Sequence, residues 1–247
     1  MISIIIPVLN QAEMTRECLD ALLDNTKGLL YPDIIIIDNG SEPPFIPKGA
    51  ANGSIRIIRN EENLGFPVAI NQGIRAAKGD VICLLNNDVF VTPGWADRLL
   101  TALDTHDIVG PVTNYCAGEQ RVRLELYNDL DELNTEAVKW SEMHDGRVDD
   151  INWVIGFCMM FRKSLYDEIG EFDESIWPSS GEEIDFCLRA KDAGKKTGIA
   201  VDVYVHHEGS VTFKDIDKEH PYKDIIERSD NHLKNKWKEK YASQGAE

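Results

Sequence analysis

Apolar and polar stretches alternate along residues 1–112. Apolar runs that predict strands cover residues 2–8, 34–37, 54–58 and 81–85. Apolar residues at helical spacing predict helices between them, over about 11–25, over 67–79 and from Pro93 onward. Fully apolar strands that alternate with helices are typical of a parallel sheet with helices on both faces. We therefore expect an α/β fold with a Rossmann-like, mostly parallel central sheet.

The pattern after residue 112 is less regular. Residues 114–152 are polar and acidic, and one helix is expected there, around 135–143. The other expected elements are strands over 153–161 and 197–205, a helix over 181–193 and an amphipathic C-terminal helix over 221–241. We divide the chain into one domain over 1–220, with halves 1–112 and 113–220, and a C-terminal helix and tail over 221–247.

Composition narrows the class of protein. Hydrophobic residues make up 43% of the 247, and no stretch approaches the roughly 20 apolar residues of a membrane span. A secretory signal starts with a basic region, whereas this sequence enters an apolar run at once. A net charge of -17 argues against a general nucleic-acid binder, which needs basic patches. The five cysteines, at 18, 83, 116, 158 and 187, lack metal-type spacing and are typical of a reduced, cytoplasmic protein.

Polar residues follow three of the predicted strands directly. Asn10 follows the first strand, Asp38 the second, and Asn86-Asn87-Asp88 the fourth. In parallel sheets, ligands bind beyond the carboxyl ends of the strands. An anionic ligand there would need backbone amides, a helix N-terminus or a divalent cation, because the chain as a whole is acidic.

Six segments stand in order between residue 2 and about residue 213: "SIIIPVLNQ", "IIIIDNGS", "NEENLGFPVAINQGIRAAKGDVICLLNNDV", "GFCMMFRKSLYDEIGEFDE", "GEEIDFCLRAKDAG" and "VHHEGSVTF". Together they resemble the family 2 glycosyltransferases of the GT-A fold. The resemblance implies an inverting transfer of a sugar from a UDP- or dTDP-sugar to a hydroxyl group, in bacterial-type polysaccharide or glycoconjugate synthesis. The acceptor would be a saccharide or be linked to a lipid or a protein.

The same resemblance assigns tasks to the parts of the chain. Residues 1–112 would bind the nucleotide sugar, and 113–220 would bind the acceptor. Peripheral association with the inner membrane face and a homodimer are both compatible with a cytoplasmic enzyme of this kind.

The resemblance implies a divalent cation, Mn²⁺ or Mg²⁺, at Asp88. Such cations take oxygen ligands and neutralise the charge that develops on a diphosphate leaving group. The family usually has Asp-X-Asp here, and this chain keeps only the last carboxylate. His207, which stands five residues before Thr212, fits the position of a further ligand better than His206 does. The alternatives are an Asx turn at the strand end and a structural histidine.

The segment "GEEIDFCLR" resembles the part of the family that supplies the catalytic base. The usual pattern is Glu-Asp-X-Asp, so Glu183 takes the position of the base, with Glu182 as the second choice. A carboxylate there would deprotonate the acceptor hydroxyl as it attacks. The alternative is structural, because Ser180 and Glu183 have the spacing of a capping box and a Glu in the first turn suits the helix dipole.

Several residues would contact the nucleotide sugar according to the resemblance. Asp38 would accept a hydrogen bond from the pyrimidine N3–H, in a base pocket lined by Pro7 and Val8. The remaining donor-binding candidates are Asn10, Asn63, Gly65, Asn71, Asn86 and Asn87. The alternative is local structure, since "DNGS" is a common turn sequence and Asn-Leu-Gly and Asn71 suit a tight turn and a helix cap.

Two other functions remain as hypotheses. The degenerate metal motif is compatible with a module of a polysaccharide-synthesis complex that binds nucleotide sugar without turnover. A sugar nucleotidyltransferase is less compatible, because the first turn, "PVLNQAEM", lacks the Gly-rich loop with Arg and Lys that binds a nucleoside triphosphate.

Overall fold

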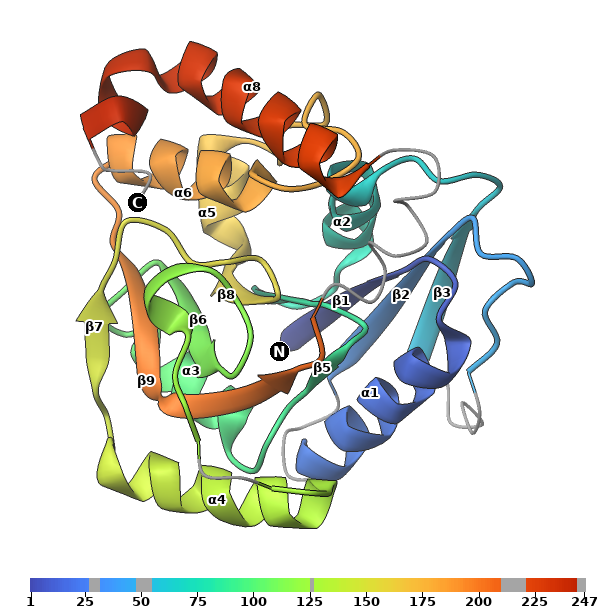
Figure 1. Cartoon of the computed structure of the whole chain (residues 1–247), viewed down its shortest axis with the longest axis vertical. Helices are drawn as coiled ribbons and strands as arrows, with labels where there is room; N and C mark the ends of the chain where they lie inside the picture. Colours follow the sequence, from blue (N-terminus) through green and yellow to red (C-terminus); the bar gives the residue numbers. More distant parts are fainter. Residues whose placement is uncertain (27–31, 48–54, 125–126, 210–220, 244–247) are drawn as a thin grey trace.

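A computed structural model describes residues 1–26, 32–47, 55–124, 127–209 and 221–243. The first half contributes four parallel strands in the order β3-β2-β1-β4 (Figure 1). Their bounds are β1 Ile2–Val8, β2 Asp33–Asn39, β3 Ile55–Asn60 and β4 Val81–Leu85. The run of isoleucines in β2 lies between two neighbouring strands, as its apolar character predicts.

The second half extends the same sheet with mixed strand directions. β8 (Cys158–Arg162) runs antiparallel to β4, and β6 (Ile108–Thr113) runs antiparallel to β8 but parallel to β9 (Thr197–His207). The short strands β5 (Val89–Phe90) and β7 (Val148–Asp150) pair antiparallel with β9. The expected α/β fold is confirmed, and the antiparallel β8 separates its two parallel parts.

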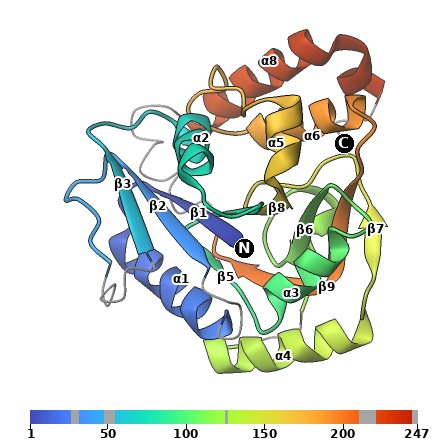
Figure 2. The ribbon, with the colours of Figure 1, turned by 180° about the vertical axis from the view of Figure 1, so that it is seen from behind.

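Helices cover both faces of the sheet (Figure 2). One face packs against α1 (Ala12–Asn25) and α3 (Trp95–Ala102). The other packs against α2 (Phe66–Ala76), α5 (Lys163–Ile169) and α6 (Glu182–Asp192). The remaining helices are α4 (Leu130–Met143) beside β9, the 3₁₀ turn η1 (Gly118–Gln120) and α8 (Tyr222–Ser243), which packs on α6.

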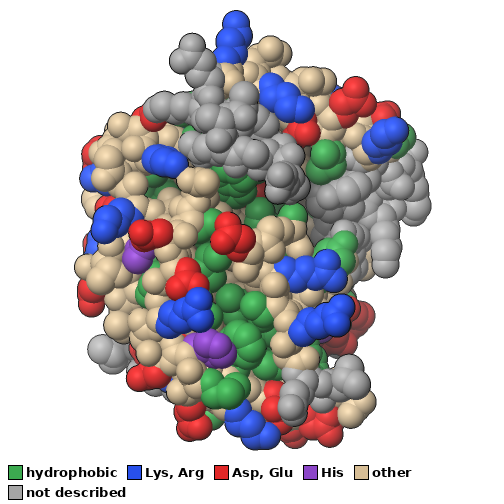
Figure 3. All heavy atoms as spheres, turned by 60° about the vertical axis from the view of Figure 1, so that its left-hand side comes forward, with side chains coloured by type: hydrophobic (Ala, Val, Ile, Leu, Met, Phe, Trp, Pro, Cys, Tyr) green, Lys and Arg blue, Asp and Glu red, His purple; other side chains and the backbone are tan. Residues whose placement is uncertain are grey.

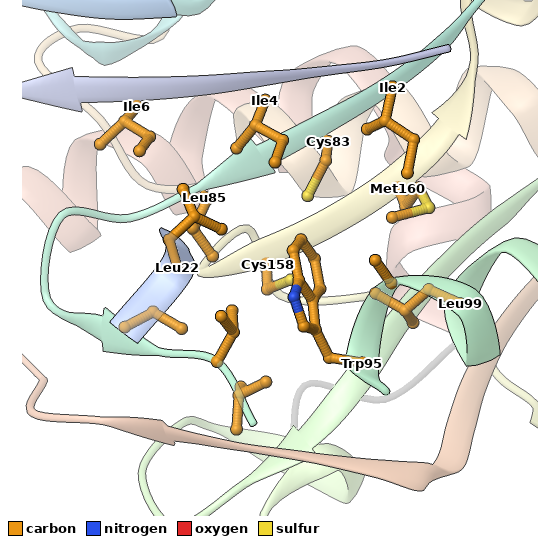
Figure 4. Packing of buried hydrophobic residues seen from close by; sticks show 14 of the residues in the cluster. Ile2, Ile4, Ile6, Leu22, Cys83, Leu85, Trp95, Leu99, Cys158 and Met160 are labelled. Atoms are coloured by element: carbon orange, nitrogen blue, oxygen red, sulfur yellow. The ribbon is translucent and has the colours of Figure 1, made fainter. Parts of the chain in front are cut away.

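Successive residues of β1 fill two separate cores. Ile4 and Ile6 pack toward Trp95, whereas Ile5 packs on the opposite side with α2. Side chains alternate between the faces of a strand, so a strand that is covered on both sides is apolar at most positions, and the one buried hydroxyl of β1, Ser3, is hydrogen-bonded to Asp33. Figure 4 shows the first of these cores, with the Trp95 ring, 1% exposed, among residues of β1, β4 and β8.

The expected elements differ from the observed ones mainly after residue 112. The helix expected over 135–143 is longer, because the Asp129 side chain accepts a hydrogen bond from the Glu132 amide (2.9 Å) and starts α4 earlier. The strand expected over 153–161 is wrong for its first part, since β8 begins at Cys158. β6 was not predicted from the sequence, because it contains a Gly-Pro pair that is typical of turns. Ser54, the expected start of β3, lies outside the described residues.

In the described part of the chain, no helix has both the length and the apolar character needed to cross a membrane. All five cysteines are free, and four of them are buried. The fifth, Cys116, is partly exposed and lines the cavity described below.

Candidate active site

A cavity of about 580 Å³ lies at the carboxyl ends of β1 and β4. Its wall has three parts. The first consists of residues that end or follow β1, β2 and β4, and the second comes from the segments before η1, β8 and α6. The third part is α8, which closes one side of the cavity. Ligands of parallel α/β sheets bind at this edge, so the cavity is the candidate active site.

Most of the residues predicted from the sequence meet at this cavity. Those that line it are Pro7, Val8, Asn63, Asn86, Asn87, Asp88, Glu182, Glu183 and His207. Those that do not line it are Asn10, Asp38, Gly65 and Asn71. The two segments expected to carry the metal and the base therefore face one space, although almost 100 residues of sequence separate Asp88 from Glu183.

Asp88 and His207 lie side by side in the cavity wall. β5 pairs antiparallel with β9 so that Val89 is opposite His207, and this pairing brings the end of β4 to the end of β9. His207 Nε2 lies 3.3 Å from Asp88 Oδ1, and both side chains are largely buried. His206 points elsewhere and contacts the Tyr127 hydroxyl. Thr212, which favoured His207 in the sequence, lies outside the described residues.

The ring of His207 has a defined orientation. Its Nδ1 lies 2.8 Å from the Tyr115 carbonyl oxygen, which can only accept, so Nδ1 carries the proton in the neutral imidazole. The ring also stacks on Phe157, with centroids 5.3 Å apart. Nε2 then presents a lone pair to the Asp88 carboxylate. Two acceptors at 3.3 Å need a proton or a cation between them, and a divalent cation fits this pair.

Two amide side chains precede Asp88 in the sequence and line the same cavity. Asn86 Oδ1 is buried and accepts no hydrogen bond from any described residue. Asn87 is held by its amide nitrogen, which donates to Thr15 Oγ1 (2.9 Å). The described residues contain no cluster of three or more His, Cys, Asp or Glu side chains around one point. A cation here would therefore depend on amide oxygens, water or phosphate oxygens for its remaining ligands, as Mg²⁺ sites commonly do.

Glu182 and Glu183 form the first turn of α6. The helix begins at Gly181, whose amide donates to Glu183 Oε2 (3.0 Å). The predicted capping box of Ser180 and Glu183 is therefore wrong, because Gly181 is the N-cap residue and Glu183 accepts from its amide instead of that of Ser180. Glu182 is 4% exposed, and its Oε2 has no hydrogen-bond partner among the described residues. A buried carboxyl oxygen without a partner is costly and marks a position where a ligand can donate.

Burial shifts the pKa of both glutamates in the same direction. Burial raises the pKa of the Glu182 carboxyl group well above its ordinary value, and the charge of Glu183 raises it further. Burial also raises the pKa of Glu183, but hydrogen bonds from backbone amides, including that of Gly181, oppose the rise. Backbone amides therefore stabilise the charged form of Glu183, which suits a carboxylate that accepts a proton from a substrate.

The third acid of the segment has a structural task. Asp185 is fully buried and binds Arg189 Nε of its own helix at 2.8 Å. It also accepts from Trp237 Nε1 at 2.9 Å and pairs with Lys236 Nζ at 2.8 Å, both on α8. These contacts fasten α8 to α6, the helix that carries the two glutamates.

Close packing of α8 against Gly181 brings the helix into the cavity wall. A Cβ atom at Gly181 would lie 2.5 Å from Ser229 Oγ and 2.9 Å from Leu233 Cδ1, so only glycine fits. Ser229 also donates to the Ser180 carbonyl. The residues of α8 that line the cavity are Ile226, Ser229, Asp230 and Leu233. From the sequence, α8 was expected only as a C-terminal helix outside the domain. The glycine directly before the acidic pair, Gly181, is the sequence feature that permits this close packing of α8.

Asp38 serves the fold in this structure. Its carboxylate accepts hydrogen bonds from the amides of Ser41 (3.0 Å) and Phe45 (2.9 Å) and pairs with Arg59. The side chain is 1% exposed. These contacts with the amides of the following segment agree with the alternative that the "DNGS" sequence forms a local turn. The next residue, Asn39, lines the cavity instead and binds the side chain of Asn63 (2.9 Å).

The other predicted donor-binding residues outside the cavity also have local partners. Asn10 Oδ1 accepts from the Glu42 amide (2.9 Å). Asn71 is fully buried and binds both the carbonyl and the amide of Phe172, at 2.9 and 3.1 Å. Gly65 starts α2 with φ 89°, where a Cβ atom would lie 2.6 Å from Trp177 Cδ1. These residues shape the segments around the site.

Comparison with known proteins identifies the family. The family described as "Glycosyl transferase family 2" matches residues 3–170, more than half of the chain. An uncharacterized glycosyltransferase, YwdF, from Bacillus subtilis is 30% identical over 76% of this chain and 67% of its own length. The pre-mycofactocin glycosyltransferase of Mycobacterium tuberculosis is 27% identical over 87% of this chain, which spans 44% of that relative.

The fold is shared with a solved glycosyltransferase. The crystal structure of GalNAc-T7 with UDP, GalNAc and Mn²⁺ matches with a TM-score of 0.65 at 16% identity, over 84% of this chain and 43% of that chain. The sheet and its covering helices thus define the class as GT-A. The chain belongs to glycosyl transferase family 2.

Asp38→Asn tests the structural role of that residue. The variant should lower the free energy of unfolding by about 1–3 kcal/mol, because a buried charge-assisted hydrogen-bond set is weakened. Hydrogen bonds and Arg59 hold the pKa of Asp38 below its ordinary value despite burial. Its contribution is therefore full above about pH 4 and is lost as pH falls through the lowered pKa. Denaturant unfolding at several pH values measures this.

The control for this variant is Asp20→Asn, an exposed carboxylate on α1. If Asp38→Asn is as stable at neutral pH as Asp20→Asn and the unmodified protein, Asp38 does not have the structural role described above.

Proposed function

We propose that this protein transfers a sugar from a UDP- or dTDP-sugar to a hydroxyl acceptor with inversion, in polysaccharide or glycoconjugate synthesis. The observation that carries the proposal is the approach of His207 Nε2 to Asp88 Oδ1, 3.3 Å, in the cavity that also contains Glu182 and Glu183. The solved GalNAc-T7 structure holds UDP, GalNAc and Mn²⁺, which supports a nucleotide-sugar donor and a divalent cation for this fold.

In this proposal Asp88 and His207 hold Mn²⁺ or Mg²⁺, and Asn86 and Asn87 border the same corner. The cation would offset the negative charge that develops on the departing diphosphate. Pro7 and Val8 lie in the cavity wall beside the end of β1, where they can contact a base. Pyrimidine recognition by Asp38 stays a prediction, and it would require the carboxylate to exchange one of its present partners.

Glu183 is the proposed base. The acceptor oxygen forms a bond to the anomeric carbon as the bond from that carbon to the diphosphate oxygen breaks, and the diphosphate leaves with the electron pair. The hydroxyl proton passes to the Glu183 carboxylate. Burial raises the pKa of Glu182, and in its protonated form this residue can donate a hydrogen bond to a sugar or acceptor oxygen. Attack opposite the leaving group inverts the anomeric configuration.

The binding module without turnover receives less support. Its motivation was the loss of one carboxylate from the metal motif. His207 and the Asn86 oxygen stand at the same corner and can compensate in part. A carboxylate suited to accept a proton lies in the same cavity, and a pure binding module has no need of one.

Asp88→Asn tests the cation. The variant should lose the enhancement of UDP binding by Mn²⁺, because the charged ligand is gone while size is kept. We expect at least about a tenfold weaker UDP affinity in Mn²⁺, equivalent to about 1.4 kcal/mol, and little change in EDTA. Isothermal titration in both buffers measures this. The control is Asp97→Asn, an exposed acid in the first turn of α3. Unchanged Mn²⁺ dependence in Asp88→Asn would refute the assignment.

Glu183→Gln tests the base. The variant keeps an oxygen for the Gly181 amide but cannot take a proton, so the transfer rate should fall by about 10²–10⁴-fold while donor affinity holds. In the unmodified enzyme the raised pKa of Glu183 shifts the acidic limb of kcat/KM above the ordinary Glu value of about 4.3. Rates are measured with the acceptor that the unmodified enzyme accepts from a glycan panel.

Glu182→Gln is the matched comparison for this experiment. It should retain more turnover than Glu183→Gln, since a neutral amide resembles the protonated acid in shape and can still donate. Full activity in Glu183→Gln would favour a purely capping role. Loss of turnover in Glu182→Gln alone would move the base to the neighbouring residue.

A further inference from the structure

Arg121 has no ionic partner, although the chain carries 43 acidic residues against 26 basic ones. Its guanidinium makes no hydrogen bond or ion pair with any residue that the structure describes. Other arginines lie against carboxylates: Arg16, Arg56, Arg59, Arg75, Arg98, Arg147, Arg162 and Arg189. Figure 3 shows acidic and basic side chains interspersed over one face of the molecule. Arg123 on the same segment is also exposed and without an ion pair among the described residues, so what distinguishes Arg121 is its place in the cavity wall.

Arg121 lines the candidate active site. Among the described residues that line this cavity, it is the one Lys or Arg, and the carboxylates there are Asp88, Glu182, Glu183 and Asp230. Burial raises the pKa of the Cys116 thiol in the same wall to about 12, and the charge of Arg121 opposes this rise. The guanidinium is thus close enough to act on the cavity wall.

The backbone that carries Arg121 is fixed on both sides. The preceding residue, Gln120, is 1% exposed and donates from Nε2 to the Pro111 carbonyl at 2.8 Å. Its Oε1 accepts from the Ile155 amide at 2.6 Å, in the segment that leads into β8. Arg121 itself bridges Thr113 at the end of β6. The arginine therefore projects from an anchored segment, and a ligand need not order the backbone in order to use it.

The charge balance of the cavity indicates what Arg121 binds. The diphosphate of a nucleotide sugar brings about two negative charges, and Asp88 adds a third. One divalent cation offsets about two of these charges, and the carboxylates of Glu183 and Asp230 line the same cavity, so negative charge remains that a guanidinium can offset. Its planar group of donors also matches phosphate oxygens better than a lysine ammonium does.

We propose that Arg121, the one Lys or Arg among the described residues that line the cavity, binds the diphosphate of the donor. This inference rests on the proposed function and adds a residue to it. Arg121 remains unpaired in the free protein because its partner arrives with the substrate. The charge-assisted bonds that form also stabilise the diphosphate as it leaves.

The test compares Arg121→Gln with Arg123→Gln. Arg123 lies two residues along the same segment, is exposed, has no ion pair among the described residues and does not line the cavity. The two variants therefore change the net charge equally. The probes are UDP, uridine and inorganic pyrophosphate, each titrated in Mn²⁺ and followed calorimetrically, with thermal midpoints as a check on folding.

Arg121→Gln should bind UDP and pyrophosphate about 10- to 100-fold more weakly than the unmodified protein, the loss expected for a hydrogen-bonded charge. Uridine affinity and the thermal midpoint should not change. Arg123→Gln should bind all three probes as the unmodified protein does.

The outcomes separate this inference from the proposed function. If UDP binds and Arg121→Gln binds it equally well, or Arg123→Gln loses as much, Arg121 is not the diphosphate residue. If the unmodified protein binds pyrophosphate through Arg121 but shows no gain for UDP, the arginine assignment stands and the pyrimidine donor is wrong. Binding of neither UDP nor pyrophosphate overturns both.

Discussion

The antiparallel pairing of β5 with β9 is the constraint on which the candidate active site depends. Parallel β1 and β4 bring their polar ends to one edge of the sheet, but this alone leaves Asp88 at the edge formed by residues 1–112. The two-residue strand β5 turns the chain back so that Val89 lies opposite His207. The end of the last strand thereby meets the end of β4, and two halves of the domain that are distant in sequence share one cavity.

The electrostatics of the acids follow from this architecture. Asp38 and Asp33 have backbone amides, hydroxyls and arginines around them, so their pKa values are lowered although burial alone would raise them. Glu182 and Glu183 face the cavity without a cationic partner among the described residues, and burial raises their pKa values. The surroundings of Asp33 and Asp38 therefore favour the charged form, whereas those of Glu182 and Glu183 favour the uptake of a proton. The groups around a carboxyl group therefore determine whether its charged or its protonated form is favoured.

Local patterns made the first half of the chain predictable. The isoleucine runs fixed β1 and β2, and polar residues at the strand ends marked the edge that carries the cavity. Features that depend on long-range contacts were missed. Asp38 was chosen over Asn39, yet the buried acid binds the following turn while the amide faces the cavity, because successive strand residues point to opposite sides. The wall formed by α8 and the position of Arg121 depend on tertiary packing alone.

The central claim is that Asp88 and His207 hold one cation together. The most direct test is a double-mutant cycle of Asp88→Asn and His207→Gln. The affinity for Mn²⁺ in the presence of UDP is measured from the electron paramagnetic resonance signal of the free ion. Each single variant should weaken Mn²⁺ binding. The double variant should lose clearly less binding free energy than the sum of the two single losses, because residues that share one ligand are coupled. Additive losses, or a His207→Gln variant with unchanged Mn²⁺ affinity, would contradict a shared site.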